Sequence, residues 1–472
     1  MKKHLIILFS ASMIIRIVFA LGLDTSKPHY GMSTHYVELA YMLASGGGYN
    51  TILLDDNNSS KTLAMLSLEL SKVGKKICTS TKLPFDRNNT TPEYWRPPGY
   101  PIFLLILYWL FGEPLFLFAT ITQAIIGAFI PILIYFIGIK LFNEKIAICS
   151  MWLGAIYPPL LFIQLQVLPD SFQILFILFA LYYFIYGIFE KKTKYLIFTG
   201  FTIGIGFLFR PEIIILIPLF SLILLVLYRT SKITIKGIII IFICSSLFIA
   251  PWVIRNHNKT GYWYITTGTW AVTWQGIGDR VNKWGATLSD EDVDAMAKKH
   301  GFHSWMAPDA DKWFKQKVLQ CLVEDPLFFL IGAIHRLPEV VATPFDLGYV
   351  NPSRTKGFKS YFRLEKNLNT FQTIFQNKVY VIKAFWDRWI IAFISLIAMF
   401  SMIFMAIRNR RDFKKWIIFL SIPGCFMLIR VGTLADFRYL TPVIPFQLMA
   451  LSFIYFEVKG YLKKTDSTFV KK

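Results

Sequence analysis

The feature that most constrains this 472-residue chain is a series of long apolar runs separated by short clusters of lysine and arginine. Hydrophobic residues make up 55% of the chain, the mean hydropathy is +0.49, and only 17% of residues are charged. A helix needs about 20 apolar residues to cross the hydrocarbon core of a bilayer. A soluble chain of this length would not contain so many such runs. The sequence therefore predicts an all-α integral membrane protein.

The formal net charge of +21 fits the same interpretation. The basic residues fall between apolar runs, as the positive-inside rule expects for cytoplasmic loops. Contact with anionic lipid headgroups accounts for most of the surplus, so membrane lipids are expected partners and nucleic acid is not. The remaining basic residues are available to bind a phosphate.

The charge bias also selects a topology. Leu5–Leu23 is expected to be a retained signal anchor, because no small-residue cleavage site follows it. The apolar stretch Ile102–Phe111 is too short to span and is expected to form a re-entrant or surface helix. Counting it as a span would put Lys140 and Lys145 outside. The sequence thus predicts a bundle of about ten transmembrane helices with both termini in the cytoplasm. The expected spans are Leu5–Leu23, Leu115–Gly138, Ile146–Leu165, Ser171–Phe189, Tyr195–Phe209, Ile213–Tyr228, Gly237–Val253, Trp389–Ile407, Trp416–Ile429 and Tyr439–Glu457.

Two large extracytoplasmic loops interrupt these spans. The first covers residues 24–114 and is expected to carry helices at Ser33–Ser45 and Lys61–Val73, because apolar residues recur there at helical spacing. The second covers residues 255–384 and is expected to carry an interfacial helix near Pro326–Leu337. The chain then divides into a transmembrane module at 1–260 that includes the first loop, the second loop at 255–384, and C-terminal helices with a cytoplasmic tail at 385–472.

Charged residues that are costly to place near lipid collect at the outer ends of the expected helices. They include Asp170, Arg210 in the run Arg210-Pro211-Glu212, and Arg255. Each has a simpler explanation, since an acid can cap a helix N-terminus and an arginine can extend to the interface. Arg16, in the first span, either extends to the interface in this way or faces a polar site. Arginines that gather outside, against the positive-inside trend, favour an anionic ligand such as a phosphate.

Short motifs along the chain follow one another in a recognisable order. They are Tyr36-x-x-Leu39-Ala40-x-x-Leu43-Ala44-x-Gly46-x-Gly48-Tyr49, Arg96-Pro97-Pro98-Gly99-Tyr100-Pro101, Tyr157-Pro158-Pro159 before Asp170, Gly204-x-x-Phe207-x-x-Arg210-Pro211-Glu212, Pro251-Trp252-x-x-Arg255-Asn256 and Arg438-Tyr439-x-x-Pro442. The set resembles the GT-C superfamily of membrane glycosyltransferases, relatives of the protein O-mannosyltransferases and the lipid A aminoarabinose transferase. The resemblance covers roughly the first 260 residues well and the last 40 weakly.

This resemblance implies a function. It implies transfer of a sugar from a polyprenyl-phosphate donor to a glycan, lipid or protein acceptor, on the extracytoplasmic side of the cell inner membrane and with inversion at the sugar carbon. A first-loop acid would act as the general base, and basic side chains would hold the leaving lipid phosphate. By resemblance, Asp170 matches the second acidic position of the family. The residues that the resemblance suggests for the phosphate are Arg96, Arg210 and Arg255, and those for the substrate are His35, Tyr36 and Tyr100.

The sequence departs from the family at one position. Met32 stands where the family usually has an aspartate about four residues before Tyr36, and a methionine cannot accept a proton. The nearby acids that can substitute are Glu38, Asp24 and Glu93. No residue spacing indicates a metal site, although a divalent metal stays open. Alternative functions are a non-catalytic binder or transporter of lipid-linked saccharides, and a polysaccharide polymerase or ligase.

Overall fold

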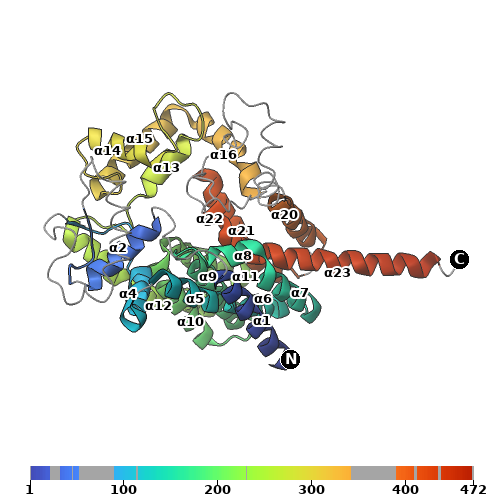
Figure 1. Cartoon of the computed structure of the whole chain (residues 1–472). Helices are drawn as coiled ribbons and strands as arrows, with labels where there is room; N and C mark the ends of the chain where they lie inside the picture. Colours follow the sequence, from blue (N-terminus) through green and yellow to red (C-terminus); the bar gives the residue numbers. More distant parts are fainter. Residues whose placement is uncertain are drawn as a thin grey trace, which may run out of the picture.

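The computed structural model describes most of the chain as helix (Figure 1). The described residues are 2–21, 32–44, 46–52, 90–112, 115–229, 231–341, 390–408, 412–433 and 437–469. Asp24, the expected helix at Lys61–Val73 and the side chain of Met32 lie outside what is described.

One helix, or two or three consecutive helical elements, lies at each expected span. These elements are α1 (Lys2–Leu21), α5 (Leu115–Gly127) with α6 (Phe129–Leu141), α7 (Glu144–Ile156) with α8 (Pro158–Ile163), α9 (Asp170–Phe189), α10 (Thr193–Phe209), η2 (Pro211–Ile215) with α11 (Leu216–Tyr228), α12 (Lys232–Thr260), α20 (Ile391–Arg408), α21 (Phe413–Gly432), and α22 (Phe437–Leu440) with η7 (Thr441–Val443) and α23 (Ile444–Phe469). The expected short helices are α2 (Met32–Ala44), α4 (Gly99–Phe111) and α16 (Pro326–Val341).

The helical membrane class is confirmed, whereas the number of spans stays a prediction. Within the described ranges, six helices are long and apolar enough to cross a membrane. The number rises to seven if α15 (Pro308–Glu324) and α16, which meet at a bend of 100°, form one span. Four further apolar helices are shorter, namely α1, α4, α10 and α20.

Small residues allow two central helices of the bundle to pack closely. A Cβ atom added at Gly200 of α10 would lie 2.6 Å from the Cβ atom of Cys244 on α12. One added at Gly204 would lie 2.7 Å from the carbonyl oxygen of Ser245. Membrane helices commonly associate through such small residues, because they bring the two backbones together.

Arg16 is fully buried within the bundle, so of the two alternatives for this residue the one in which it extends to the interface is wrong. The reason lies in the break between α7 and α8. Pro158 and Pro159 have no N–H to donate to the carbonyl groups of Gly154 and Ala155, four residues earlier. Arg16 donates to both carbonyl oxygens instead, at 3.0 Å each. The arginine therefore completes the broken end of α7.

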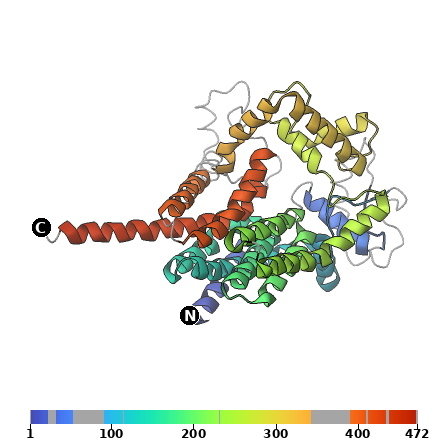
Figure 2. The same ribbon diagram turned by 180° about the vertical axis from the view of Figure 1, so that it is seen from behind.

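Residues 261–341, here named the cap, form a helical unit on one side of the bundle (Figures 1 and 2). The cap contains α13 (Thr269–Ile277), α14 (Asp290–Lys299), α15 and α16, and it has its own apolar core. Arg336 of α16 fixes the cap to the bundle. It donates to Asp279 at 2.7 Å and to the carbonyl oxygen of Val431, at the end of α21, at 2.9 Å.

Candidate functional site

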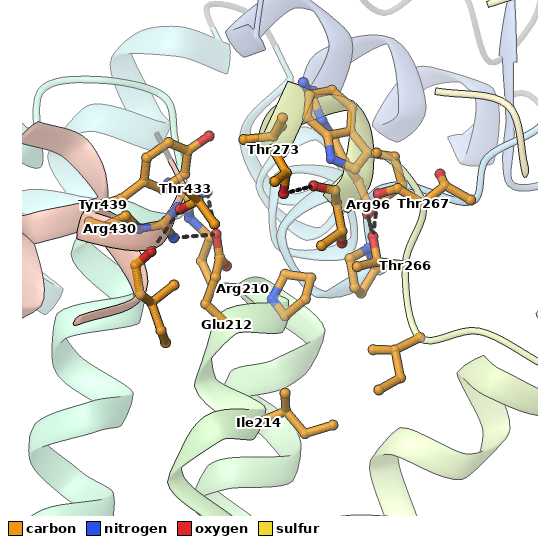
Figure 3. A pocket seen from close by; sticks show the side chains of 18 of the residues that line it. Arg96, Arg210, Glu212, Ile214, Thr266, Thr267, Thr273, Arg430, Thr433 and Tyr439 are labelled. Atoms are coloured by element: carbon orange, nitrogen blue, oxygen red, sulfur yellow. Dashed lines mark hydrogen bonds and ion pairs between the residues drawn. The ribbon is translucent and has the colours of Figure 1, made fainter. Parts of the chain in front are cut away.

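A cavity of about 360 Å³ lies where the bundle, the segment 93–98 and the cap meet (Figure 3). Three arginines, one carboxylate, five threonines, three aromatic residues and seven apolar or small residues line it. They are Arg96, Arg210, Arg430, Glu212, Thr266, Thr267, Thr269, Thr273, Thr433, Tyr36, Trp95, Tyr439, Pro97, Pro211, Ile214, Ile265, Gly268, Val272 and Ile429. Such a lining offers many hydrogen-bond donors and a net positive charge.

Asp170 lies behind one wall of this cavity and joins two arginines. It is the first residue of α9, and its side chain is only 1% exposed. Arg210, at the end of α10, donates to Oδ1, and Arg438 of α22 donates to Oδ2 at 3.2 Å. A carboxylate buried this deeply needs charged, hydrogen-bonded partners. Asp170 therefore holds the helix ends that carry the two arginines.

Glu212 is the single carboxylate among the described residues that line the cavity. Its Oε1 atom lies 3.7 Å from Arg210 Nη1 and 3.9 Å from Arg430 Nη2. Its Oε2 atom is buried and accepts no hydrogen bond within the described structure. The Arg430 guanidinium also stacks over the Tyr439 ring, 4.0 Å from its centroid. Figure 3 shows these residues together on one wall of the cavity.

Arg96 lies on the opposite wall, beside the threonines of the cap (Figure 3). Its guanidinium carbon lies 4.3 Å from the ring centroid of Tyr36 and 4.4 Å from that of Trp95. Glu93 shapes the turn that carries it, because Oε1 accepts the backbone N–H groups of Trp95 and Arg96 at 2.7 and 2.8 Å. The Oε2 atom lies 3.0 Å from His35 Nε2.

The surroundings of Glu93 also fix its ionisation. Burial alone would raise the pKa of this carboxyl. The charge and hydrogen bond of His35, together with Arg96, outweigh burial and lower the pKa below its usual value. Glu93 is thus a carboxylate that is already engaged by hydrogen-bond donors, and it is a weak proton acceptor.

Arg255 has structural partners at the strand ends near the site. It donates to the backbone carbonyl groups of Glu93 and Tyr49, the latter at 3.0 Å. Tyr49 precedes β1 (Asn50–Ile52) and Glu93 follows β2 (Thr90–Pro92), and these strands pair antiparallel. Arg255 is not among the described residues that line the cavity.

Two other residues expected at the site lie in the supporting structure. Glu38 is buried and accepts a hydrogen bond from the Thr51 hydroxyl at 3.1 Å. Tyr100 is fully buried, and its hydroxyl donates to Gln123 Oε1 at 2.6 Å. Of the residues expected from the sequence, the cavity therefore brings together Arg96, Arg210 and Tyr36.

Three site residues were not assigned from the sequence, and each carried a signal. Glu212 directly follows the Arg210-Pro211 pair. Arg430 ends an apolar run, where a charge is costly and therefore informative. Arg438 belongs to the last quoted motif, but nothing in the sequence indicated that it pairs with Asp170.

Among the described residues, no three histidine, cysteine, aspartate or glutamate side chains converge in a group that could hold a metal ion. The donors that do converge in the cavity, guanidinium and hydroxyl groups, suit an anionic group with hydroxyl neighbours.

Comparison with known proteins gives a family match and a fold match. Residues 95–254 match the family model described as dolichyl-phosphate-mannose-protein mannosyltransferase. The oligosaccharyltransferase of Archaeoglobus fulgidus in its apo form matches with a TM-score of 0.50 and 13% identity, over 98% of this chain and 52% of that one. The chain thus spans about half the length of that enzyme.

A second solved structure is ArnT from Cupriavidus metallidurans bound to undecaprenyl phosphate, with a TM-score of 0.40 and 12% identity over 95% of this chain and 77% of that one. Comparison with curated proteins gives no match. The resemblance to the GT-C superfamily that the motifs predict is confirmed by the family match and the fold. The matched segment contains Arg96, Asp170, Arg210 and Glu212.

Proposed function

We propose that this protein is a membrane glycosyltransferase that transfers a sugar from a polyprenyl-phosphate donor to a hydroxyl group of an acceptor. The family match over residues 95–254 and the fold support this proposal. One observation carries the proposal. Among the described residues, three arginines and one carboxylate line a cavity at the ends of apolar helices, partly within the family-matched segment. The name of the matched family supports a polyprenyl-type phosphate as the carrier of the sugar.

The charge change of the reaction explains the arginines. The donor is a phosphodiester with one negative charge. When the acceptor oxygen bonds to the anomeric carbon, with inversion, the bond from that carbon to the phosphate oxygen breaks, and a phosphomonoester with a second charge leaves. Arg210 and Arg430 on one wall and Arg96 on the other hold this growing charge. Groups that bind the dianion better than the monoanion stabilise the transition state.

The proton of the acceptor hydroxyl also needs a destination, and Glu212 provides it. Asp170 is occupied by two arginines, Glu93 by two backbone N–H groups and His35, and Glu38 by Thr51. Glu212 faces the cavity and has one oxygen that accepts no hydrogen bond among the described residues. It accepts the proton as the new glycosidic bond forms. Asp170 acts as a positioning residue through Arg210 and Arg438.

The experiment is a transfer assay with purified protein in lipid and a panel of radiolabelled polyprenyl-phosphate sugars, which follows release of the lipid phosphate. Glu212→Gln is expected to lower the rate at least a hundredfold while donor binding is retained, since general-base catalysis contributes about 10²–10⁴-fold. Arg430→Gln, by contrast, is expected both to lower the rate and to weaken donor binding. Glu291→Gln, an exposed carboxylate on α14, is the matched control and keeps the wild-type rate.

Two outcomes contradict the proposal. One is tight donor binding without release when membrane extracts supply acceptors, which identifies a binder of lipid-linked saccharides. The other is wild-type transfer by Glu212→Gln, which removes this residue from the reaction.

A further inference from the structure

A second cavity, of about 530 Å³, lies within the cap between α14 and α15. Pockets for small ligands commonly have volumes of about 300–1,000 Å³. Three indole rings, two lysines and a histidine stand out in its lining: Trp274, Trp284, Trp313, Lys299, Lys317 and His300. No carboxylate is among the described residues that line it. The cavity is therefore both aromatic and basic.

The helical spacing of α15 produces one wall. Trp313, Lys317 and Gln320 are three or four residues apart, so they share one face of the helix. The Lys317 ammonium lies 5.5 Å from the Trp313 ring centroid, and the His300 ring at the end of α14 lies 4.4 Å from it. The wall thus presents a flat ring with positive charge beside it.

Trp274 adds a hydrogen-bond donor that has no use within the described structure. Its side chain is 2% exposed, and its indole N–H has no hydrogen-bond partner there. A buried indole N–H usually has a partner, because leaving it unpaired is costly. A ligand in this cavity can supply the missing acceptor.

The short helix α13 connects this cavity to the candidate active site. Thr273 lines the first cavity, and the next residue, Trp274, lines the second. One molecule that is long enough to pass α13 can therefore contact both cavities.

We infer that the aromatic cavity of the cap binds an anionic saccharide, namely an acidic sugar unit of the acceptor glycan. Its role as an acceptor site rests on the proposed transferase function, whereas the binding itself does not. The apolar faces of sugar rings pack on indole rings, and sugar oxygens accept the Trp274 N–H. Lys299 and Lys317 pair with the acidic group of the sugar.

The test measures binding by the full-length protein in lipid nanodiscs, without any polyprenyl-phosphate donor. The probes are a hyaluronan tetrasaccharide, which is acidic, and a neutral N-acetylglucosamine tetramer of the same length. The acidic probe is expected to bind about tenfold more tightly at low salt, and the difference should narrow as salt screens the lysines. Equal affinity for the two probes, or no saturable binding of the acidic one, overturns the inference.

Matched variants locate the binding. Trp313→Ala is expected to weaken the acidic probe about tenfold or more, because it removes the stacking ring. The control Trp263→Ala changes an exposed tryptophan outside the cavity and should have no effect. Lys299→Gln should weaken the acidic probe about threefold and leave the neutral probe unchanged. The control is Lys298→Gln, at the neighbouring residue that pairs with Asp294, and it should leave the binding of both probes unchanged.

Trp274→Phe separates the N–H group from the ring. Because the N–H has no partner among the described residues, its removal breaks no hydrogen bond of the described structure, so any fall in the melting temperature reports only the smaller ring. Binding of the probe should weaken. Wild-type affinity in both Trp274→Phe and Trp313→Ala overturns the inference.

The two proposals fail independently. If the acidic probe binds but no polyprenyl-phosphate donor reacts, the transferase proposal fails and the binding site stands. If transfer depends on Glu212 but neither probe binds, the transferase proposal stands and this inference is wrong.

Discussion

At the scale of single residues, the site depends on carboxylates that differ in what they contact. Asp170 accepts hydrogen bonds from Arg210 and Arg438. Glu212 lines the cavity 3.7 Å from Arg210 and 3.9 Å from Arg430, and its buried Oε2 atom accepts no hydrogen bond among the described residues. The same chemical group thus serves in one place to position cations and in the other to take part in a reaction. Variants of the two carboxylates should therefore fail in different ways.

Asp170→Asn is expected to lose both stability and transfer. The change removes the negative charge that two buried guanidinium groups contact, which should lower the free energy of unfolding by about 3 kcal/mol. Thermal unfolding in detergent measures the loss. Glu190→Gln, at the other end of α9, removes a surface partner of Lys140 and Lys192 and should leave both properties unchanged. Wild-type stability in Asp170→Asn would show that the arginines do not depend on this carboxylate.

At the scale of secondary structure elements, the bundle depends on one helix end that a side chain completes and on one pair of helices that pack closely. The break after α7 leaves two carbonyl groups that Arg16 completes, and α10 packs on α12 through glycines. Both features follow from covalent structure, since proline lacks an N–H and glycine lacks a Cβ atom. Each gives a prediction that differs in sign from the usual effect of the substitution.

Arg16→Met is expected to destabilise the protein although it replaces a charge in an apolar helix by an apolar residue. The carbonyl groups of Gly154 and Ala155 lose their donors, and each unpaired carbonyl group costs about 1–3 kcal/mol. The midpoint of thermal unfolding should fall. A rise in the midpoint would mean that burying the charge costs more free energy than the hydrogen bonds to the two carbonyl groups contribute.

Gly204→Ala is expected to destabilise the bundle by about 1–3 kcal/mol through overpacking against Ser245. Alanine normally improves a helix by about 1 kcal/mol relative to glycine, so the sign depends on the close contact. Gly424→Ala is the matched control, because nothing lies within 4 Å of a Cβ atom there, and it should stabilise α21. The measurement is the unfolding midpoint of each variant, which should fall in Gly204→Ala and rise in Gly424→Ala. Equal shifts would contradict close packing of α10 on α12.

The contact between α13 and α15 should make the stability of the cap depend on pH. Asp311 accepts the N–H of Trp270 at 2.9 Å, and burial raises the pKa of Asp311 to about 6. An ordinary aspartate has a pKa of about 3.9, so the folded cap favours the protonated carboxyl. The stability of the cap should therefore fall as the pH rises from about 4 to about 6, and should change little above that range.

Hydrogen exchange of the α13 amides between pH 4 and 7 measures this dependence. Asp311→Asn should remove it, since the amide does not titrate, while Asp309→Asn on the exposed side of the same helix should keep it. Protection that rises with pH through this range would contradict the raised pKa.

At the scale of the whole molecule, the apolar runs predict where the helices lie, because the periodicity and length of an apolar run are local properties of the sequence, and bilayer thickness sets the length that a span needs. The family resemblance likewise leads to Arg96 and Arg210. The meeting of Glu212, Arg430 and Tyr439 could not be predicted in the same way, because α21 reaches η2 only through the packing of the folded bundle. Arg255 shows the reverse case, since its sequence position suits a phosphate but its partners are carbonyl groups at the strand ends.

The position of the cap over the bundle leads to a last prediction. Arg336 joins Asp279 and the carbonyl group of Gly276 in the cap to Val431, the neighbour of the cavity residue Arg430. Arg336→Gln should therefore let the two walls of the cavity separate, and transfer should fall about tenfold or more, since a displacement of about 1 Å can cost 10²-fold. The Michaelis constant for the donor should rise together with the loss in turnover. Hydrogen exchange should increase at the ends of both α13 and α21.

The exposed neighbour His335 provides the control, because His335→Gln leaves these contacts in place. Faster exchange in the cap with unchanged transfer would mean that the bundle alone forms the reacting part of the cavity. In that case the threonines of the cap contribute nothing to donor binding, and the residues outside the cap, namely Arg96, Arg210, Glu212 and Arg430, are sufficient.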